Sequence, residues 1–292
     1  MRFLHVNVFS DVPYGGNGLA VFPDATGLDP DQMLRITQEL HHFESVFLFP
    51  SDAGAGPRIR ARVFDLSEEL DFAGHPVIGA AAVLHRLAGM GRPADWTLEL
   101  KARTVRVRVR QDGRSYEGVL DQGAASFLGQ PDIEGLASWF DLEPRDLHPD
   151  LPPQVVSTGL RYLIVPVRPG VLDRARIRFD LTEPLHQVGA QFAYLLDADE
   201  LEGRHWNNDG ILEDVATGSA AGCVAAYLRR HERLAAEETV TLRQGRHLGR
   251  PSSMTIGTYD IAPDRHGVRV GGHVSLVAEG HLTELPRGTP PR

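Results

Sequence analysis

AGHPVIGAAAVL, residues 73–84, is a run of small and apolar residues behind a Gly-His-Pro turn, and it predicts a buried helix. A second run of this kind, TGSAAGCVAAYL, occupies residues 217–228 and also follows acidic residues and an apolar strand pattern. The runs share glycine at 74 and 218, alanine at 81 and 225 and at 82 and 226, and leucine at 84 and 228. This repetition predicts a duplicated domain in which each half is a strongly curved sheet or barrel around one central helix.

Strand patterns surround both small-residue runs. Those of the first half are FLHVNVF, LAVF, ESVFLF, RIRARVF and the alternating segment from 96 to about 125. Those of the second half are VVSTGLRYLIVPV, AQFAYLL, VTLRQGRHLGRPSSMTIGTYD and VRVGGHVSLVAEGHL, and further helix patterns cover 29–42 and 133–142. We therefore predict an α+β chain with an N-terminal domain over residues 1–115, a C-terminal domain over 116–280 and a tail over 281–292.

Composition excludes several function classes. The net charge of -9 argues against nucleic-acid binding, which requires a basic face. The only lysine, Lys101, lies in a strand pattern, so pyridoxal phosphate bound as a Schiff base is not expected. The single cysteine, Cys223, allows no intramolecular disulfide, which fits a reducing cytoplasm. No signal-peptide pattern or long apolar run occurs, so we expect a cytoplasmic protein without a membrane partner.

Polar residues cluster at the starts of the two predicted helices. A helix N-terminus offers unpaired N–H groups and partial positive charge, and it suits a carboxylate or a developing oxyanion. His75 and Ser219 occupy equivalent places at these starts, and Asp214 lies just before the second. The local pattern leaves simpler alternatives open. His75 as a cap of its own helix, Ser219 as an ordinary first-turn serine, and Asp214 as a partner of the helix dipole are all compatible with it.

Glu44 stands at the start of the apolar strand pattern ESVFLF. A carboxyl group buried there would have a raised pKa and could exchange a proton near neutral pH. The alternative is a solvated glutamate at a strand end. His41 and His42 precede it at a helix end, where they complement the dipole. They have no recognisable metal-ligand spacing with Glu44, so we expect no metal site.

Glycine-rich stretches give no support for a nucleotide cofactor. PYGGNG, residues 13–18, lacks the GxGxxG spacing and opens no clear helix. The sequence contains no Walker-type GxxxxGK[ST] motif and no GxSxG elbow. We therefore expect no cofactor.

Taken together, the motifs resemble the phenazine-biosynthesis PhzF-like family over nearly the whole chain. The matching stretches, in order, are NVFSDVPYGGNGLAVF, ESVFLF, ELDFAGHPVIGAA, STGLRYLIVPV, EDVATGSAAGCVAAYL, QGRHLGRPS and VRVGGHVSLVAEGHL. The resemblance implies the diaminopimelate-epimerase-like fold, with two similar domains and a site between them. The catalytic cysteines of that epimerase match Ala73 and Thr217 here, so this chain cannot use its two-thiol chemistry.

This resemblance also implies a reaction and a set of site residues. Glu44 corresponds to the acid/base of a cofactor-independent isomerase that shifts a proton on a small unsaturated carboxylate, such as a dihydro-hydroxyanthranilate. His75 and Asp214 would assist it. The groups implied in substrate binding are Gly74, Gly218, Thr217, Ser219 and Asn17. A homodimer is also implied. The alternatives are an isomerase of alkylated-proline biosynthesis and a non-catalytic small-molecule binding protein.

Three positions depart from the family pattern beside the presumed site. Val215 replaces a common proline, Asp65 begins a pair that replaces Thr-Pro, and Val46 replaces a smaller residue. These departures leave the fold expectation intact and the substrate undefined.

Overall fold

The computed structural model describes residues 1–50, 58–132, 134–263 and 265–288. The chain forms two compact units, Met1–Asp121 with Gly271–Arg292, and Gln122–Val270. These bounds differ from the predicted division into 1–115 and 116–280. The difference arises because the last long strand returns to the N-terminal strand and pairs with it.

Unit 1 contains a barrel of eight strands closed by the pairing of its first and last members, in the order β1-β2-β3-β4-β6-β7-β8-β16. The strands are β1 (Arg2–Val8), β2 (Asn17–Phe22), β3 (Glu44–Phe49), β4 (Arg58–Asp65), β6 (Ala94–Glu99), β7 (Thr104–Asp112), β8 (Ser115–Ala124) and β16 (Arg265–His281). The short β5 (Glu69–Leu70) pairs with β4. Both β8 and β16 also contribute residues to unit 2.

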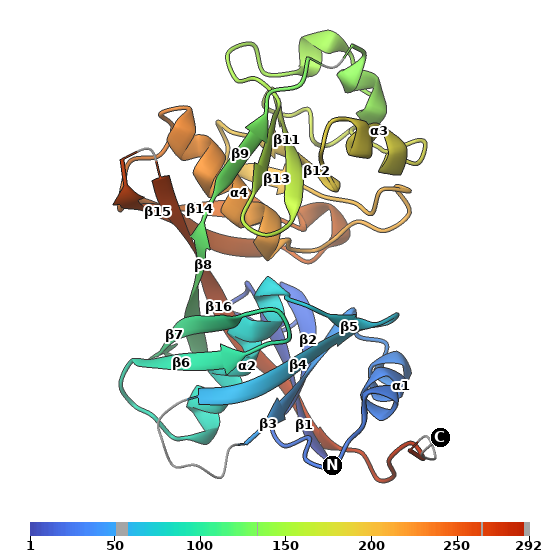
Figure 1. Ribbon diagram of the computed structural model, residues 1–292, viewed down its shortest axis with the longest axis vertical. Helices are drawn as coiled ribbons and strands as arrows, with labels where there is room; N and C mark the ends of the chain where they lie inside the picture. Colours follow the sequence, from blue (N-terminus) through green and yellow to red (C-terminus); the bar gives the residue numbers. More distant parts are fainter. Residues whose placement is uncertain (51–57, 133, 264, 289–292) are drawn as a thin grey trace. The chain divides into compact units, whose positions relative to one another are not determined.

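Helix α2 (Gly74–Leu87) is the central helix of unit 1, and Figure 1 shows it running among the strands. It contacts β1, β2, β3, β6 and β7. A Cβ on Gly79 would lie 2.5 Å from Leu19 and 3.0 Å from Val8, so the helix backbone rests directly on the strand side chains. The predicted small-residue helix inside a curved sheet is confirmed for this half.

Helix α1 (Pro30–Leu40) lies on the other side of the sheet, against β3 and β4. Its start is as predicted: Asp29 is the N-cap, its side chain accepts a hydrogen bond from the Gln32 amide, and Pro30 follows. Phe22, Phe47 and Met33 belong to the apolar cluster beneath it. The outer face of β2 and β3 is therefore also covered.

Unit 2 is built on the continuation of the same sheet beyond β16, in the order β16-β15-β14-β13-β12-β11-β10-β9. Its further strands are β9 (Ser126–Gly129), β10 (Gln154–Ser157), β11 (Arg161–Val167), β12 (Phe192–Asp197), β13 (Glu202–Arg204), β14 (Thr239–Gln244) and β15 (Ser252–Ala262). Its helices are η1 (Leu136–Phe140), η2 (Pro144–Asp146), α3 (Thr182–Gln187), α4 (Gly218–Arg230) and η3 (Arg246–Leu248).

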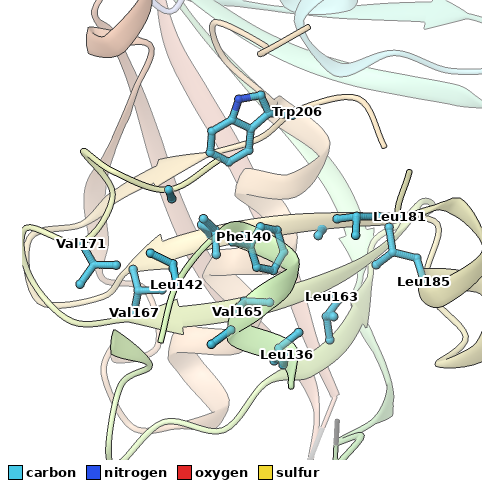
Figure 2. Packing of buried hydrophobic residues seen from close by; sticks show 14 of the residues in the cluster. Leu136, Phe140, Leu142, Leu163, Val165, Val167, Val171, Leu181, Leu185 and Trp206 are labelled. Atoms are coloured by element: carbon cyan, nitrogen blue, oxygen red, sulfur yellow. The ribbon is translucent and has the colours of Figure 1, made fainter. Parts of the chain in front are cut away.

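The sheet of unit 2 is covered on both faces. On one face α4 contacts β10, β11 and β15. On the other, Leu163, Val165 and Val167 of β11 pack in an apolar cluster with Phe140 and Trp206, drawn in Figure 2. The alternation along β11 therefore separates the α4 face from this second core.

One predicted element of unit 2 needs correction, and one element was not predicted. The helix pattern over 133–142 forms only the 3₁₀ helix η1, because Gly135 and Asp141 adopt left-handed backbone conformations at its two ends. Residue 133 lies outside the described residues. The short helix α3 has no counterpart among the predicted elements. Within the described part of the chain, no helix is long and apolar enough to span a bilayer.

Candidate active site

Glu44 and His75 lie side by side on the interior face of the barrel in unit 1. Glu44 begins β3, and its register partner on the parallel strand β2 is Leu19. Leu19 faces α2, as its closeness to Gly79 shows, so Glu44 points toward α2 as well. His75 is the second residue of α2 and places Nε2 3.0 Å from Glu44 Oε2.

Both side chains of this pair are mostly enclosed. The exposed fraction is 19% for Glu44 and 9% for His75. A solvated strand-end glutamate is therefore not what the structure contains. His75 does not cap its own helix either, because the N-cap is Ala73 and its helix start has no side-chain cap hydrogen bond. Burial lowers the pKa of His75 to about 3, so its imidazole is neutral at neutral pH.

Next to the pair, the start of α2 presents backbone groups. Gly74 is the first helical residue and is buried, and Ala73 provides no capping side chain. The first amides of a helix have no partner within the helix and carry partial positive charge. The Glu44 carboxyl group thus lies beside a helix start suited to an anionic ligand.

Asn17 lies on the same interior face of the sheet as Glu44. It is the first residue of β2, pairs with Val8 and is 4% exposed. Two residues on, Leu19 is the register partner of Glu44. Because alternate residues of a strand share a face, Asn17 points to the interior side as Leu19 does. Asn17 therefore lies on the same interior face of the barrel as the Glu44 carboxyl group.

The two histidines before β3 do not belong to this interior face. His41 ends α1 with a left-handed backbone (φ 53°), and its Nδ1 lies 3.0 Å from the Glu39 carbonyl oxygen. The ring of His42 packs edge-on against His5, 4.5 Å between centroids. Burial and the neighbouring His5 lower the pKa of His42 to about 4. Across residues 1–50, 58–132, 134–263 and 265–288, no group of three or more metal-ligating side chains occurs.

In unit 2, the turn before α4 carries Asp214 and Thr217. Thr217 Oγ1 donates a hydrogen bond of 2.7 Å to Asp214 Oδ2, and the Ala216 amide donates one of 3.3 Å to Oδ1. The surrounding protein desolvates the carboxylate and raises the pKa of Asp214, while nearby His205 and these hydrogen bonds oppose that rise. We name residues 214–217 the Asp214 turn.

A buried ion pair supports the segment that leads into the Asp214 turn. Arg204 donates from Nε and Nη2 to the two carboxylate oxygens of Glu213, at 2.8 and 2.7 Å, and 3% and 8% of the two side chains are exposed. The Asp214 amide donates to the carbonyl oxygen of His205, which is thus held beside it. His205 Nδ1 lies 2.9 Å from the Ala193 carbonyl oxygen, and burial lowers the pKa of this histidine. The buried ion pair and these hydrogen bonds therefore hold the Asp214 turn in place.

Ser219 is in the first turn of α4 but is not its N-cap. The N-cap is Thr217, without a side-chain cap hydrogen bond to the helix. Ser219 Oγ instead lies 2.8 Å from the hydroxyl of Tyr162 on β11. The serine hydroxyl is thus oriented by a neighbouring strand rather than by its own helix.

The predicted site residues thus form two groups. Glu44, His75, Gly74 and Asn17 lie on the interior face of unit 1 or at the start of α2. Asp214, Thr217, Gly218 and Ser219 lie at the start of α4 in unit 2. As the overlay of the two runs predicts, α2 and α4 both begin at a glycine, Gly74 and Gly218.

Three residues that shape the second group were not predicted from the sequence. Tyr162 orients Ser219, His205 lies beside Asp214, and Gln244 binds the Asp214 turn. The signal for Gln244 was present, since the stretch QGRHLGRPS matches the family pattern. No spacing within the chain could link Gln244 to a turn 30 residues earlier.

Comparisons with known proteins show which chains this one is similar to. The family model described as phenazine biosynthesis-like protein matches residues 6–280. Trans-2,3-dihydro-3-hydroxyanthranilate isomerase of Pseudomonas aeruginosa is 30% identical, over 96% of this chain and 98% of the relative. Uncharacterized isomerase YddE of Escherichia coli O157:H7 is 31% identical, over 89% and 92%. A solved structure of a predicted epimerase from Pseudomonas aeruginosa is 48% identical, with a TM-score of 0.88 over 97% and 99% of the two chains. The α+β fold prediction is confirmed.

Proposed function

Because this chain belongs to the phenazine biosynthesis-like protein family and is an isomerase of the PhzF type, we propose that it moves a proton between two carbon atoms of a small unsaturated carboxylate. The observation that carries the proposal is the 3.0 Å approach of His75 Nε2 to Glu44 Oε2 at the start of α2. The name of the P. aeruginosa relative, a dihydro-hydroxyanthranilate isomerase, supports this substrate class.

Glu44 is the acid/base of the proposed reaction. Its carboxylate takes a proton from a carbon next to a double bond, and the electrons of the broken C–H bond form a new double bond. The existing double bond shifts, and the Glu44 carboxyl group, after exchanging its proton with solvent, delivers a proton to the distal carbon. No electrons are gained or lost overall, so the proposed step requires no redox cofactor. A positioned acid/base of this kind contributes ~10²–10⁴-fold to the rate.

His75 orients the Glu44 carboxyl group and adds no charge to it. Burial lowers the pKa of His75 to about 3, so the ring stays neutral through the working pH range. A neutral imidazole 3.0 Å from the carboxylate adds no positive charge that would lower its basicity. This supports a Glu44 that both accepts and returns a proton.

The remaining predicted residues are proposed to bind the substrate. The helix starts at Gly74 in unit 1 and Gly218 in unit 2 each offer backbone N–H groups of the kind that bind a carboxylate. Asp214, Thr217, Ser219 and Asn17 offer hydrogen-bonding side chains for its other polar groups. The positions of the Ser219 hydroxyl and the Asp214 carboxylate, each held by a neighbouring hydroxyl group, support such a role, because groups held in place bind at a smaller entropic cost.

The test uses trans-2,3-dihydro-3-hydroxyanthranilate as the probe in D₂O, with proton NMR following substrate and product. The natural chain should convert the probe and place solvent deuterium at one product carbon. Glu44→Gln should reduce turnover at least ~10²-fold, because the amide cannot take the proton. Circular dichroism and the thermal midpoint should stay unchanged, since the two side chains have similar volumes.

Two outcomes would contradict the proposal. A Glu44→Gln variant that keeps full turnover would remove the acid/base role. A natural chain that binds the probe but exchanges no carbon-bound hydrogen would remove the proton-shift chemistry for this substrate class. Dialysis against EDTA is the control for a metal, and we expect unchanged turnover.

A further inference from the structure

Gln244 is buried behind the Asp214 turn and makes four hydrogen bonds. It is the last residue of β14 and is 1% exposed. Its Nε2 donates to the Asp214 carbonyl oxygen at 2.9 Å and to Thr217 Oγ1 at 3.0 Å. Its Oε1 accepts from the Thr217 amide at 3.2 Å and from the Tyr194 hydroxyl at 3.0 Å. A primary amide has two N–H donors and two acceptor positions, so each is used.

These partners fix the direction of the Gln244 amide. A flipped amide would set Oε1 against the Asp214 carbonyl oxygen and its N–H groups against the Thr217 amide, and both contacts would be repulsive. Thr217 Oγ1 is therefore an acceptor toward Gln244. Its own hydrogen then points to Asp214 Oδ2, 2.7 Å away. A directed chain of donors runs from Gln244 through Thr217 to the carboxylate.

The backbone next to Gln244 also packs against this turn. Gly245 has φ +83°, and a Cβ on it would lie 2.6 Å from the Val215 carbonyl oxygen. The end of β14 thus contacts the Asp214 turn through the Gln244 side chain, and the next residue contacts it through the Gly245 backbone. Only glycine combines this close approach with this backbone conformation.

We propose that Gln244 is a positioning residue that acts through Thr217: it directs the Thr217 hydroxyl onto Asp214 and so keeps Asp214 a hydrogen-bond acceptor at the start of α4. The inference rests on the proposed role of Asp214 in substrate binding, and it extends that role to a residue that touches no substrate. Its consequence is that the ionised form of Asp214 is favoured although the protein around it disfavours charge.

The charged and titratable groups around Asp214 determine whether its pKa rises or falls when the donor chain is lost. Burial raises the pKa of Asp214, and the Thr217 hydrogen bond lowers it. His205 also lowers it, while the carboxylate of Asp214 in turn raises the pKa of Tyr194. Glu213 is bound to Arg204. Loss of the donor chain should therefore raise the pKa of Asp214, and the other groups remain in place.

The experiment measures the pKa of Asp214 in the resting full-length protein, by NMR titration of ¹³C-labelled aspartate carboxyl groups. Gln244→Leu and Thr217→Val should each raise it by about one unit, the size expected for one lost hydrogen bond. Thr217→Ser should restore the natural value because it keeps the hydroxyl. Tyr194→Phe is the matched control: it removes one bond to Oε1 but leaves both Nε2 donors, so the Asp214 pKa should shift by less than about half a unit.

A merely structural role of Gln244 gives a different pattern. In that case Tyr194→Phe would shift the Asp214 pKa as much as Gln244→Leu, or none of the variants would shift it, and either result overturns the proposal. If Gln244→Leu does not fold, the comparison of Thr217→Val with Thr217→Ser still decides. The titration needs no turnover, so a failure of the proposed isomerase reaction leaves its result valid. In the deuterium assay, the acidic limb of the kcat/KM profile should move with the Asp214 pKa.

Discussion

At the scale of residues, Glu44 and His75 form a close and mostly buried pair in unit 1. A histidine 3.0 Å from a carboxylate often becomes charged, because the two opposite charges attract. Here the desolvation of a nearly buried ring opposes that tendency and lowers the pKa of His75 to about 3. His75 is thus neutral in the folded protein at neutral pH. At low pH, protonation favours the unfolded chain and lowers stability.

This leads to a prediction for the pH dependence of stability. The folded-state pKa of His75 lies below its reference value of 6.5, so the unfolded chain binds the proton more readily. Stability contributed by this residue is complete above pH 6.5 and is lost as the pH falls. At about 1.4 kcal/mol per pH unit, about 2 kcal/mol should be lost between pH 7 and pH 5. Urea unfolding should show His75→Gln losing about that much less than the natural chain over this range.

The control for this prediction is His41→Gln, because His41 is exposed at the end of α1. Its unfolding free energies should parallel those of the natural chain at each pH. Other histidines with a lowered pKa, such as His42 with its pKa of about 4, add losses of the same sign to every variant. Identical slopes for His75→Gln and the natural chain would contradict a neutral His75.

At the scale of elements, α4 depends on a glycine in its interior. A Cβ on Gly222 would overlap Gln122 Oε1 and lie 2.9 Å from its Cδ and 3.3 Å from Thr158 Oγ1. Gln122 in turn donates to the Gly218 carbonyl oxygen and accepts from Thr158. Gly222→Ala, which would stabilise an exposed helix, should here cost about 1–3 kcal/mol through overpacking. Thermal unfolding of the variant measures this loss of stability.

A matched substitution separates packing from helix propensity. Ala225→Gly in the same buried helix should cost about 1 kcal/mol or more, through propensity and the lost methyl contacts. If Gly222→Ala instead raises the thermal midpoint, the close approach of Gln122 to the helix is not rigid. That result would contradict the packing argument.

The elements themselves were predictable to different degrees. The central helices α2 and α4 could be predicted, because an apolar run of small residues after a glycine turn is typical of a buried helix. The 3₁₀ helix η1 could not, since its pattern resembles an α-helix and only the left-handed Gly135 and Asp141 shorten it. The interior position of Glu44 follows from register with Leu19, which depends on strand pairing rather than on local sequence.

At the scale of the whole molecule, the sequence indicated two halves but misplaced the last strand. Residues 271–281 follow the second half in the chain, so their pattern alone assigns them to it. Their pairing with β1 closes the barrel of unit 1 instead. Contacts that join opposite ends of a chain carry no local signal. The same holds for the hydrogen bonds of Gln244 to the Asp214 turn.

The closing strand gives the last prediction. A chain ending at Val270 lacks the pairings from Val8 with Val274 to Arg2 with His281, so β1 becomes an open edge. It should lose the near-UV circular dichroism of unit 1 and the slow hydrogen exchange of β1 and β2. A chain ending at Leu282 keeps every β1 pairing and loses little more than the 2.6 Å bond from Gln32 to the Pro286 carbonyl oxygen. Its unfolding free energy should change by less than about 1 kcal/mol. Native-like exchange protection of β1 in the shorter chain would show that the barrel does not need its last strand.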